Sequence, residues 1–137
     1  MDVLKIPFVE KVGIKRRTDR NIELPFERSV QNHLQSIHAS AQFALAETAS
    51  GEILQTLFPE LVDKVTPVLR DSQIKFKKPA LKTISAYATV PEEILMNFTE
   101  QLSTKGRALI AVNVEVKDSD GLVTCMGVFN WFVQKIK

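Results

Sequence analysis

The pattern of apolar and polar residues along the chain is dominated by one long segment, residues 32–57, that carries almost no formal charge. It is built mainly from Ala, Ser, Thr and Leu, and it is followed by Phe58-Pro59, where a helix must stop. An apolar stripe with small residues on several sides is typical of a buried helix against which other backbone packs closely. The pattern therefore predicts a central helix over residues 37–57, about 30 Å long.

The rest of the chain is typical mainly of strands. Period-2 alternation or a short apolar run predicts four strands after the long helix, at 68–76, 81–90, 107–117 and 122–135. An earlier short strand is indicated over 9–14, before Leu24-Pro25 interrupts regular structure. A second, short helix is predicted over 91–103, with acidic residues in its first turn, and a hairpin turn over 118–121.

This order of elements predicts the fold. Because the later strands are joined by short connections, the sheet should be largely antiparallel, and a single long helix is left to cover one of its faces. A length of 137 residues fits one domain. We therefore predict an α+β hotdog fold over residues 1–137, in which an antiparallel sheet of five to six strands wraps round the central helix.

Composition narrows the class of protein. The chain has 45% apolar and 25% charged residues, as globular proteins do, and its net charge of +2 is too small to indicate a nucleic-acid partner. It lacks a run of about 18 apolar residues and a secretory signal pattern, so we expect a cytoplasmic protein that does not enter the membrane. The single Cys125 excludes an intramolecular disulfide and a multi-cysteine zinc site, and no metal is expected. We assign Cys125, Phe129, Trp131 and Val133 to the core.

One carboxylate, Glu47, interrupts the small and apolar face of the predicted helix. Its helical neighbours three and four positions away are Phe43, Ala44, Ser50 and Gly51. One interpretation is the exposed edge of an amphipathic helix, since Glu is rarely buried without a partner. The other is a desolvated carboxylate with a raised pKa, which is what a general base needs.

Four residues, Asn32, His38, Ala39 and Glu47, resemble the motif of the hotdog-fold acyl-CoA thioesterases of the phenylacetate type. That motif runs from an Asn, through Gly-x-x-His-Gly or a variant, to an Asp or Glu on the helix. Here Asn32 precedes His38 by six residues, and Glu47 follows Ala39 by eight. The similarity continues through residues 74–80 and the closing hairpin, so it covers roughly residues 8–136.

The resemblance implies a thioester hydrolase, and the chemistry gives the motif a physical reason. Hydrolysis develops negative charge on the carbonyl oxygen, for which the backbone N–H of Ala39 at a helix N-terminus is a fixed donor. The side-chain amide of Asn32 would be the second donor. Glu47 would activate water or attack the carbonyl directly, and no cofactor is expected.

The spacing of these residues predicts a dimer. Ala39 and Glu47 lie about 12 Å apart along one helix axis, too far for both to reach one thioester carbon within about 3 Å. In a two-fold dimer, Glu47 of one subunit can face the helix N-terminus of the other. The resemblance implies the same arrangement, so we expect a homodimer or a dimer of dimers that binds acyl-CoA at its subunit interface.

The chain also departs from the motif. Ala39 stands where relatives often have Gly, although Ala still donates an N–H. Relatives often supply a Ser or Thr from the strand after the helix to position water, and that role is not assigned here. The nearest residues are Leu69, Thr66 and Ser72. Without such a group, a non-catalytic acyl-CoA binding protein on the same fold is the alternative.

Other polar residues allow two interpretations each. His38 is more simply a structural residue at the helix start than a catalytic base, and it could also contact the substrate. His33 lies 14 residues before Glu47, as in hotdog acyl-thioester dehydratases, but the Pro-Gly-rich segment of those enzymes is absent. A cluster of lysines forms a solvated strand edge or contacts the phosphates of coenzyme A. Its members are Lys75, Lys77, Lys78 and Lys82.

Overall fold

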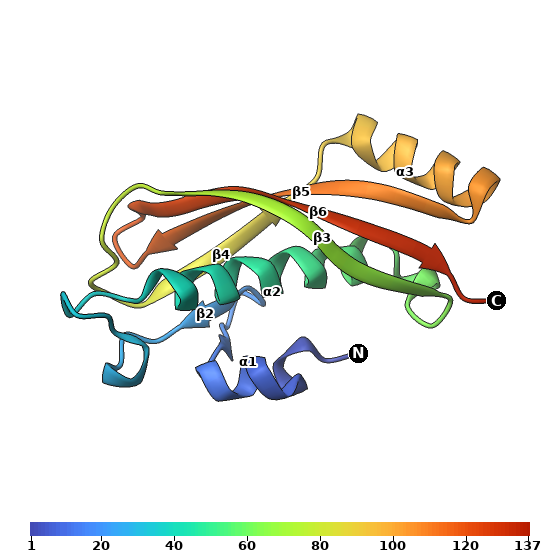
Figure 1. Ribbon diagram of the computed structural model, residues 1–137. Helices are drawn as coiled ribbons and strands as arrows, with labels where there is room; N and C mark the ends of the chain where they lie inside the picture. Colours follow the sequence, from blue (N-terminus) through green and yellow to red (C-terminus); the bar gives the residue numbers. More distant parts are fainter.

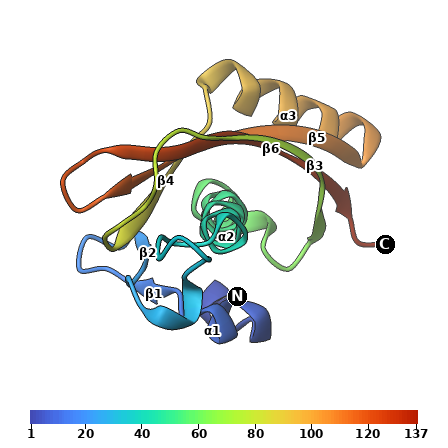
Figure 2. The same cartoon turned by 60° about the vertical axis from the view of Figure 1, so that its left-hand side comes forward.

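The computed structural model describes residues 1–137 and is organised round helix α2 (Ala39–Leu57). An antiparallel six-stranded sheet with the order β1-β2-β4-β5-β6-β3 curves round this helix, and helix α1 (Pro7–Val12) lies on the side that the larger strands leave open (Figures 1 and 2). Helix α3 (Glu92–Lys105) packs outside, along β5. The hotdog fold predicted from the order of elements is confirmed.

The strands differ greatly in length, and the three longest form one side of the sheet. They are β1 (Lys15–Arg16), β2 (Ile22–Leu24), β3 (Val65–Phe76), β4 (Ile84–Thr89), β5 (Arg107–Asp118) and β6 (Val123–Lys135). All five pairings are antiparallel. Since β3 pairs only with β6, its other edge carries unpaired backbone groups.

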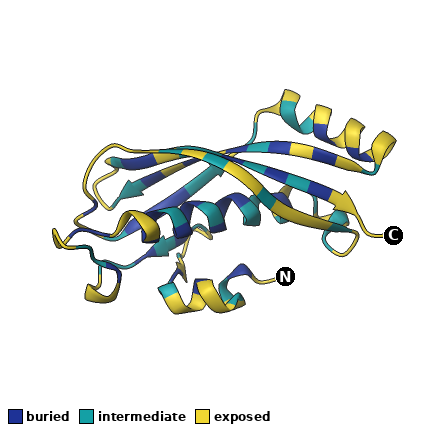
Figure 3. Ribbon diagram, viewed as in Figure 1, coloured by how far each residue is buried: buried dark blue, intermediate teal, exposed yellow.

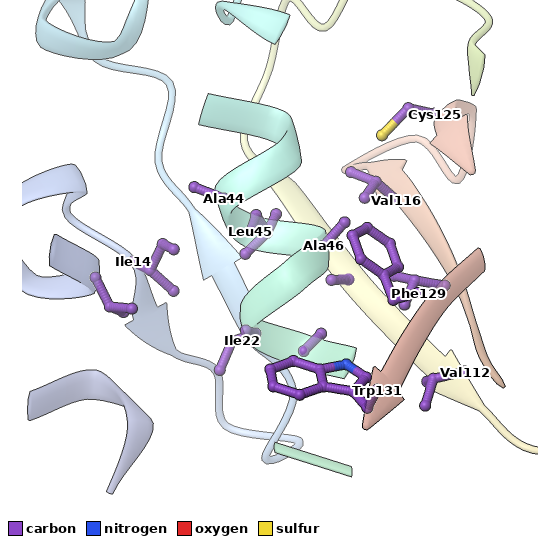
Figure 4. Packing of buried hydrophobic residues seen from close by; sticks show 14 of the residues in the cluster. Ile14, Ile22, Ala44, Leu45, Ala46, Val112, Val116, Cys125, Phe129 and Trp131 are labelled. Atoms are coloured by element: carbon purple, nitrogen blue, oxygen red, sulfur yellow. The ribbon is translucent and has the colours of Figure 1, made fainter. Parts of the chain in front are cut away.

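The core lies between α2 and the inner face of the sheet. Figure 4 shows Leu45 and Ala46 of α2 between Ile22 on one side and Phe129 and Trp131 on the other. Leu45 and Phe129 are completely buried, and the alternation of buried and exposed residues along β5 is visible in Figure 3. The small side chains of α2 let the strands approach closely, which agrees with the low charge of this helix.

Cys125 belongs to this core, as predicted. It is fully buried, and burial raises the pKa of its thiol to about 12. A thiol in such a place stays protonated and unreactive near neutral pH. Cys125 therefore contributes packing and no chemistry.

The N-terminal part corrects the prediction of a strand over 9–14. Pro7 occupies the first turn of a short helix, α1, and Gly13 ends it with a left-handed φ of 93°. Val9 and Ile14 are still buried, because α1 packs against α2. The strands at this end are β1 and β2 instead, and β2 is only three residues long.

Other boundaries also moved, and β4 is Ile84–Thr89 and not 81–90. Helix α2 begins at Ala39 and not at residue 37, because Ile37 donates its N–H to the carbonyl of Ala80 at 2.9 Å. Strand β3 begins at Val65 and includes Pro67, which an edge strand tolerates because one side of it has no strand partner. A bulge between Leu69 and Asp71 shifts the register further along β3.

Helix α3 closes one end of the molecule. Strand β4 pairs with β5 only over 113–118, so residues 107–112 of β5 have no strand neighbour on that side. α3 lies along β5, and its Phe98 is buried against Phe58 at the end of α2, with ring centroids 5.0 Å apart. No helix in the protein combines the length and the apolar character that crossing a membrane requires.

Candidate active site

A small hairpin loop holds the N-terminus of α2. Gln31 and Ile37 form an isolated bridge, and the N–H of His38 donates to the carbonyl of Val30 at 2.8 Å. The ring Nδ1 of His38 accepts from the backbone N–H of Ser40 at 3.0 Å, which caps the helix. The ring thus binds backbone at the helix start, as the structural interpretation predicts.

The first backbone N–H of the helix is free. The N–H of Ala39 has no acceptor within the protein, whereas the N–H groups of Ala41 and Gln42 both donate to the carbonyl of His38. Ala39 is also exposed. A free N–H at the positive end of a 19-residue helix is a donor suited to a negatively charged or polarised oxygen.

The side chain of Asn32 lies in the same loop with its orientation determined by hydrogen bonds. Its Oδ1 accepts from the N–H of Leu34 at 2.9 Å, and from the N–H and the hydroxyl of Ser36 at 3.1 and 3.2 Å. Three donors on one oxygen assign Oδ1 and Nδ2 of the Asn32 amide. The Nδ2 group has no protein acceptor and is available as a donor.

Glu47 lies two turns further along α2 in a different environment. Its side chain is half-buried and makes no hydrogen bond and no ion pair. Burial alone raises the pKa of the Glu47 carboxyl above its usual range. The desolvated carboxylate is therefore the interpretation of Glu47 that agrees with the structure, and the fully exposed edge is not.

An apolar cavity of about 600 Å³ opens beside Glu47. Its walls come from α2, from the first nine residues of the chain, from the beginning of β3 and from β6. Thr66 lines this cavity together with Glu47, but Leu69 and Ser72 do not. Of the three residues considered for positioning water, only Thr66 shares the cavity with the carboxylate.

A second cavity of about 580 Å³ lies on another side of α2, towards β2 and β4. Arg16 and Glu52 form a two-pronged ion pair across it, with nitrogen–oxygen distances of 2.7 and 2.6 Å. Glu47 does not line this second cavity. The two acids of α2 are therefore in contrasting places, one paired with a cation and one unpaired in an apolar wall.

The predicted lysines lie near the N-terminal end of α2. Lys75, at the end of β3, and the two lysines that follow it are exposed. The N–H groups of Lys77 and Lys78 donate to the carbonyl of Thr124, whose hydroxyl donates to Gln42 in the second turn of α2 at 2.9 Å. Lys82 is different, since its ammonium group pairs with Asp120.

The structure thus brings most of the predicted site residues together but separates one of them. The N-terminal end of α2 gathers the side chain of Asn32, the capping ring of His38, the free N–H of Ala39 and the lysines of residues 75–78. Glu47 stands about 12 Å further along the helix axis. One chain does not place the Glu47 carboxylate beside the free N–H of Ala39.

Comparison with known proteins gives the family of this chain. A model described as a domain of unknown function, DUF4442, matches residues 4–133. The chain belongs to this family. A search of the curated proteins finds no match to this DUF4442 protein.

Solved structures resemble the DUF4442 protein over nearly its whole length. A Pseudomonas aeruginosa protein of unknown function, called a probable thioesterase, has a TM-score of 0.83 and 21% identity, and the similarity covers 98% of this chain and 91% of that one. A Bacillus halodurans protein solved with CoA has a TM-score of 0.71 and 23% identity, covering 92% and 74%. A Staphylococcus aureus protein, solved as a single-substitution variant, has a TM-score of 0.70 and 15% identity, covering 94% and 99%. These similarities show the hotdog fold.

Sequence reasoning missed one polar residue of this region in the DUF4442 protein. Gln42 is buried, and its Oε1 accepts the hydroxyl hydrogen of Thr124. This bond joins the start of α2 to β6, where the carbonyl of Thr124 accepts from the N–H groups of Lys77 and Lys78. A Gln among the small and apolar residues of the first turns of α2 was the signal that could have identified it.

The raised pKa of Glu47 has a consequence for stability. Between the ordinary pKa of Glu in the unfolded chain and the raised pKa in the folded protein, the folded state binds more protons, so the free energy of unfolding falls as pH rises through this window. The loss of stability from burying the Glu47 charge is complete above the raised pKa of Glu47 and absent below the ordinary pKa of Glu. We therefore expect Glu47→Gln to be more stable than the wild type near neutral pH, with the difference vanishing in acid.

Urea denaturation at several pH values would measure this effect. Glu52→Gln is the matched control, because it removes a carboxylate that is paired with Arg16 on the same helix. It should not stabilise the protein at neutral pH. If Glu47→Gln were less stable than the wild type at neutral pH, the Glu47 carboxylate would have a favourable partner, and its desolvation would not control its pKa.

Proposed function

We propose that this DUF4442 protein hydrolyses acyl-CoA thioesters to a free acid and coenzyme A. The observation that carries the proposal is Glu47, a half-buried carboxylate without a polar partner in the wall of an apolar cavity. A carboxylate whose pKa burial has raised, and which no cation neutralises, is suited to take a proton from water. No structural need for an unpaired acid at this position is evident from its surroundings.

The donors at the N-terminus of α2 would polarise the thioester. The N–H of Ala39 and the Nδ2 of Asn32 hydrogen-bond the carbonyl oxygen, and the helix dipole stabilises the negative charge that develops on it. Glu47 takes a proton from water while the water oxygen bonds to the carbonyl carbon. The tetrahedral oxyanion then collapses, the carbon–sulfur bond breaks, and the thiolate takes up a proton. Direct attack by Glu47, followed by hydrolysis of the anhydride, uses the same residues.

We assign the two halves of this site to two subunits. The separation of about 12 Å along α2 prevents one chain from supplying both Glu47 and Ala39 to one thioester carbon. The unpaired edge of β3 supports a two-fold dimer, because it offers unpaired backbone groups beside Val68 and Phe76, which are both exposed. A second copy would bring its helix N-terminus towards Glu47.

The compared structures support acyl-CoA as the ligand and Asn32 and Glu47 as residues of the site. One neighbour was solved with CoA, and we assign the exposed Lys75, Lys77 and Lys78 to the phosphates of that molecule. In the Staphylococcus aureus protein, which is called a thioesterase, the two variants replace a glutamine and a glutamate that lie fifteen positions apart. Asn32 and Glu47 have the same separation here.

Mixing two inactive variants would test the proposed function and the shared site together. The wild type should release free thiol from at least one acyl-CoA, and Asn32→Ala and Glu47→Gln should each lose about 100-fold or more. When the two variants are unfolded and refolded together, about half of the dimers contain one of each, and each such dimer has one intact site. We therefore expect activity to recover to about a quarter of the wild-type value.

The other outcomes are equally informative. If the mixture stayed as inactive as its components, the two residues would not meet across a subunit interface. If the wild type bound acyl-CoA but hydrolysed none of a panel of short, medium, long and aryl thioesters, the protein would be an acyl-CoA binding protein on the hotdog fold.

A further inference from the structure

The cavity beside Glu47 follows one side of α2 to the end of the helix. The residues of α2 along it include Glu47, Gly51 and Leu54, whose spacing of four and three places them on one stripe of the helix, and Phe58 follows directly after the helix end. From Glu47 to Phe58 this stripe is about 16 Å long. The cavity is therefore much longer than a short acyl or a single aromatic group.

Several elements line the cavity. The first residues of the chain border it from the side of α1, below α2 in Figure 2, and β6 contributes Trp131 and Val133. The aromatic pair of Phe58 and Phe98 lines it where α2 ends. Gly51 leaves no spare room against Trp131, because a Cβ there would lie 3.1 Å from the indole ring. The chain of a ligand must thus run along α2 and not across it.

The walls of the cavity are mainly apolar and favour an acyl group without charged substituents. No Lys, Arg or His side chain lines it, and the amino group of Met1 already donates to Gln55 at 2.9 Å. The carboxylates of Glu47 and Asp63 would repel a second carboxylate on the acyl group. The buried donors in or near the wall are already used. Trp131 Nε1 donates to the hydroxyl of Ser50 at 2.9 Å, and the hydroxyl of Thr48 donates to the carbonyl of Ala44 at 2.6 Å.

We propose that the acyl group of the substrate is a linear, unsubstituted aliphatic chain of about ten to twelve carbons, which lies along α2 from Glu47 to the Phe58–Phe98 pair. An extended alkyl chain advances roughly 1.3 Å per carbon, as bonds of about 1.5 Å imply, so roughly twelve carbons fill the length of the stripe. This inference rests on the proposed thioesterase function for the position of the thioester beside Glu47.

The dependence of hydrolysis on chain length tests the proposal in the wild-type protein. Each added methylene should raise kcat/KM by up to about fourfold, the effect of burying one CH₂ group. The increase should end at about twelve carbons, and phenylacetyl-CoA should be a poor substrate. A best substrate with a short or aryl acyl group, or a rise that continues to sixteen carbons and beyond, would overturn the assignment.

A pair of substitutions to Phe tests where the chain lies. Val65 on β3 lines the cavity, whereas Met96 on α3 is exposed and does not line it. Val65→Phe should shorten the preferred chain by about three carbons and lower kcat/KM for dodecanoyl-CoA by tenfold or more. Met96→Phe, which lies away from the β3 edge, should leave the profile unchanged. Equal profiles for the two variants would exclude this cavity.

The only tryptophan gives a readout that does not need hydrolysis. Because Trp131 lines the cavity and no other tryptophan is present, its fluorescence reports what enters. Dodecanoic acid with bromine on its terminal carbon should quench Trp131, and Val65→Phe should weaken its binding by tenfold or more. Quenching without hydrolysis of any thioester would keep the acyl cavity and remove the proposed function. Hydrolysis of other thioesters without quenching would keep the function and contradict the cavity assignment. A structure of the dimer in which the second copy fills the cavity would contradict that assignment as well.

Discussion

Glu47→Gln is expected to lower kcat/KM for acyl-CoA hydrolysis by about 100-fold or more, which is the loss that removal of a general base produces. Gln has nearly the shape of Glu, and the Glu47 side chain makes no hydrogen bond or ion pair that the substitution would break. Acyl-CoA should therefore still bind. Free-thiol release measures the rate of hydrolysis, and quenching of Trp131 by the brominated dodecanoic acid measures binding in the cavity.

Glu52→Gln is the control for this variant. It removes the other acid of α2, which pairs with Arg16 and lines the separate cavity near β2 and β4. Its kcat/KM should stay close to that of the wild type. Should both variants lose activity equally, the loss would reflect a general change in α2 and the role of Glu47 as base would be wrong.

The dependence of activity on pH gives a further check on the same residue. Glu47 must be ionised to take a proton, so activity should decrease with falling pH as the carboxyl group is protonated. Because burial raises the pKa of Glu47, this decrease should occur at a higher pH than the titration of an ordinary Glu side chain. An acidic limb at the usual pKa of Glu would mean that substrate or the second subunit restores solvent-like surroundings to the carboxylate.

Phe129→Ala should destabilise the protein by about 3–5 kcal/mol, the usual cost of truncating a buried Phe. Phe129 is fully buried on β6, and its ring lies 5.5 Å from that of Phe43 on α2. Its removal would leave a cavity at the contact between the central helix and the sheet. Urea denaturation would measure the change, provided that protein concentration is held constant for an oligomer.

Phe8→Ala is the matched control, since Phe8 is 66% exposed at the surface of α1. The same truncation there should change the free energy of unfolding by about 0.5 kcal/mol or less. If Phe129→Ala cost no more than Phe8→Ala, the packing of α2 on β6 would not be what holds the sheet round the helix.

Several elements could be predicted because their signals are local. The segment of small residues with almost no charge is expected in the interior of a small domain, and Pro59 marks its end. The alternation along β5 and β6, and the turn between them, specify a hairpin without reference to the rest of the chain. The helical pattern predicted a start at residue 37, and Ala39 as the first N–H donor came from the resemblance to the thioesterase motif.

Other elements could not be predicted because their stability comes from distant contacts. Strand β2 has three residues, and its pairing with β4 involves residues about sixty positions away. Helix α1 was mistaken for a strand because its apolar residues fit both patterns, although Pro7 and Gly13 marked its ends. Its burial against α2 decides between them.

The sequence by itself determined the central helix, the antiparallel sheet and the order of Asn32, Ala39 and Glu47, because these depend on periodicity and spacing within short segments. Only the tertiary structure decided that Glu47 is desolvated and unpaired, that Asn32 presents its Nδ2 group, and that a long apolar cavity lies beside α2. A pKa, the orientation of an amide and the shape of a cavity all depend on which segments meet in space. The cavity is assembled from segments of the chain as far apart as Val3, Phe58 and Trp131, and no local pattern reports that meeting.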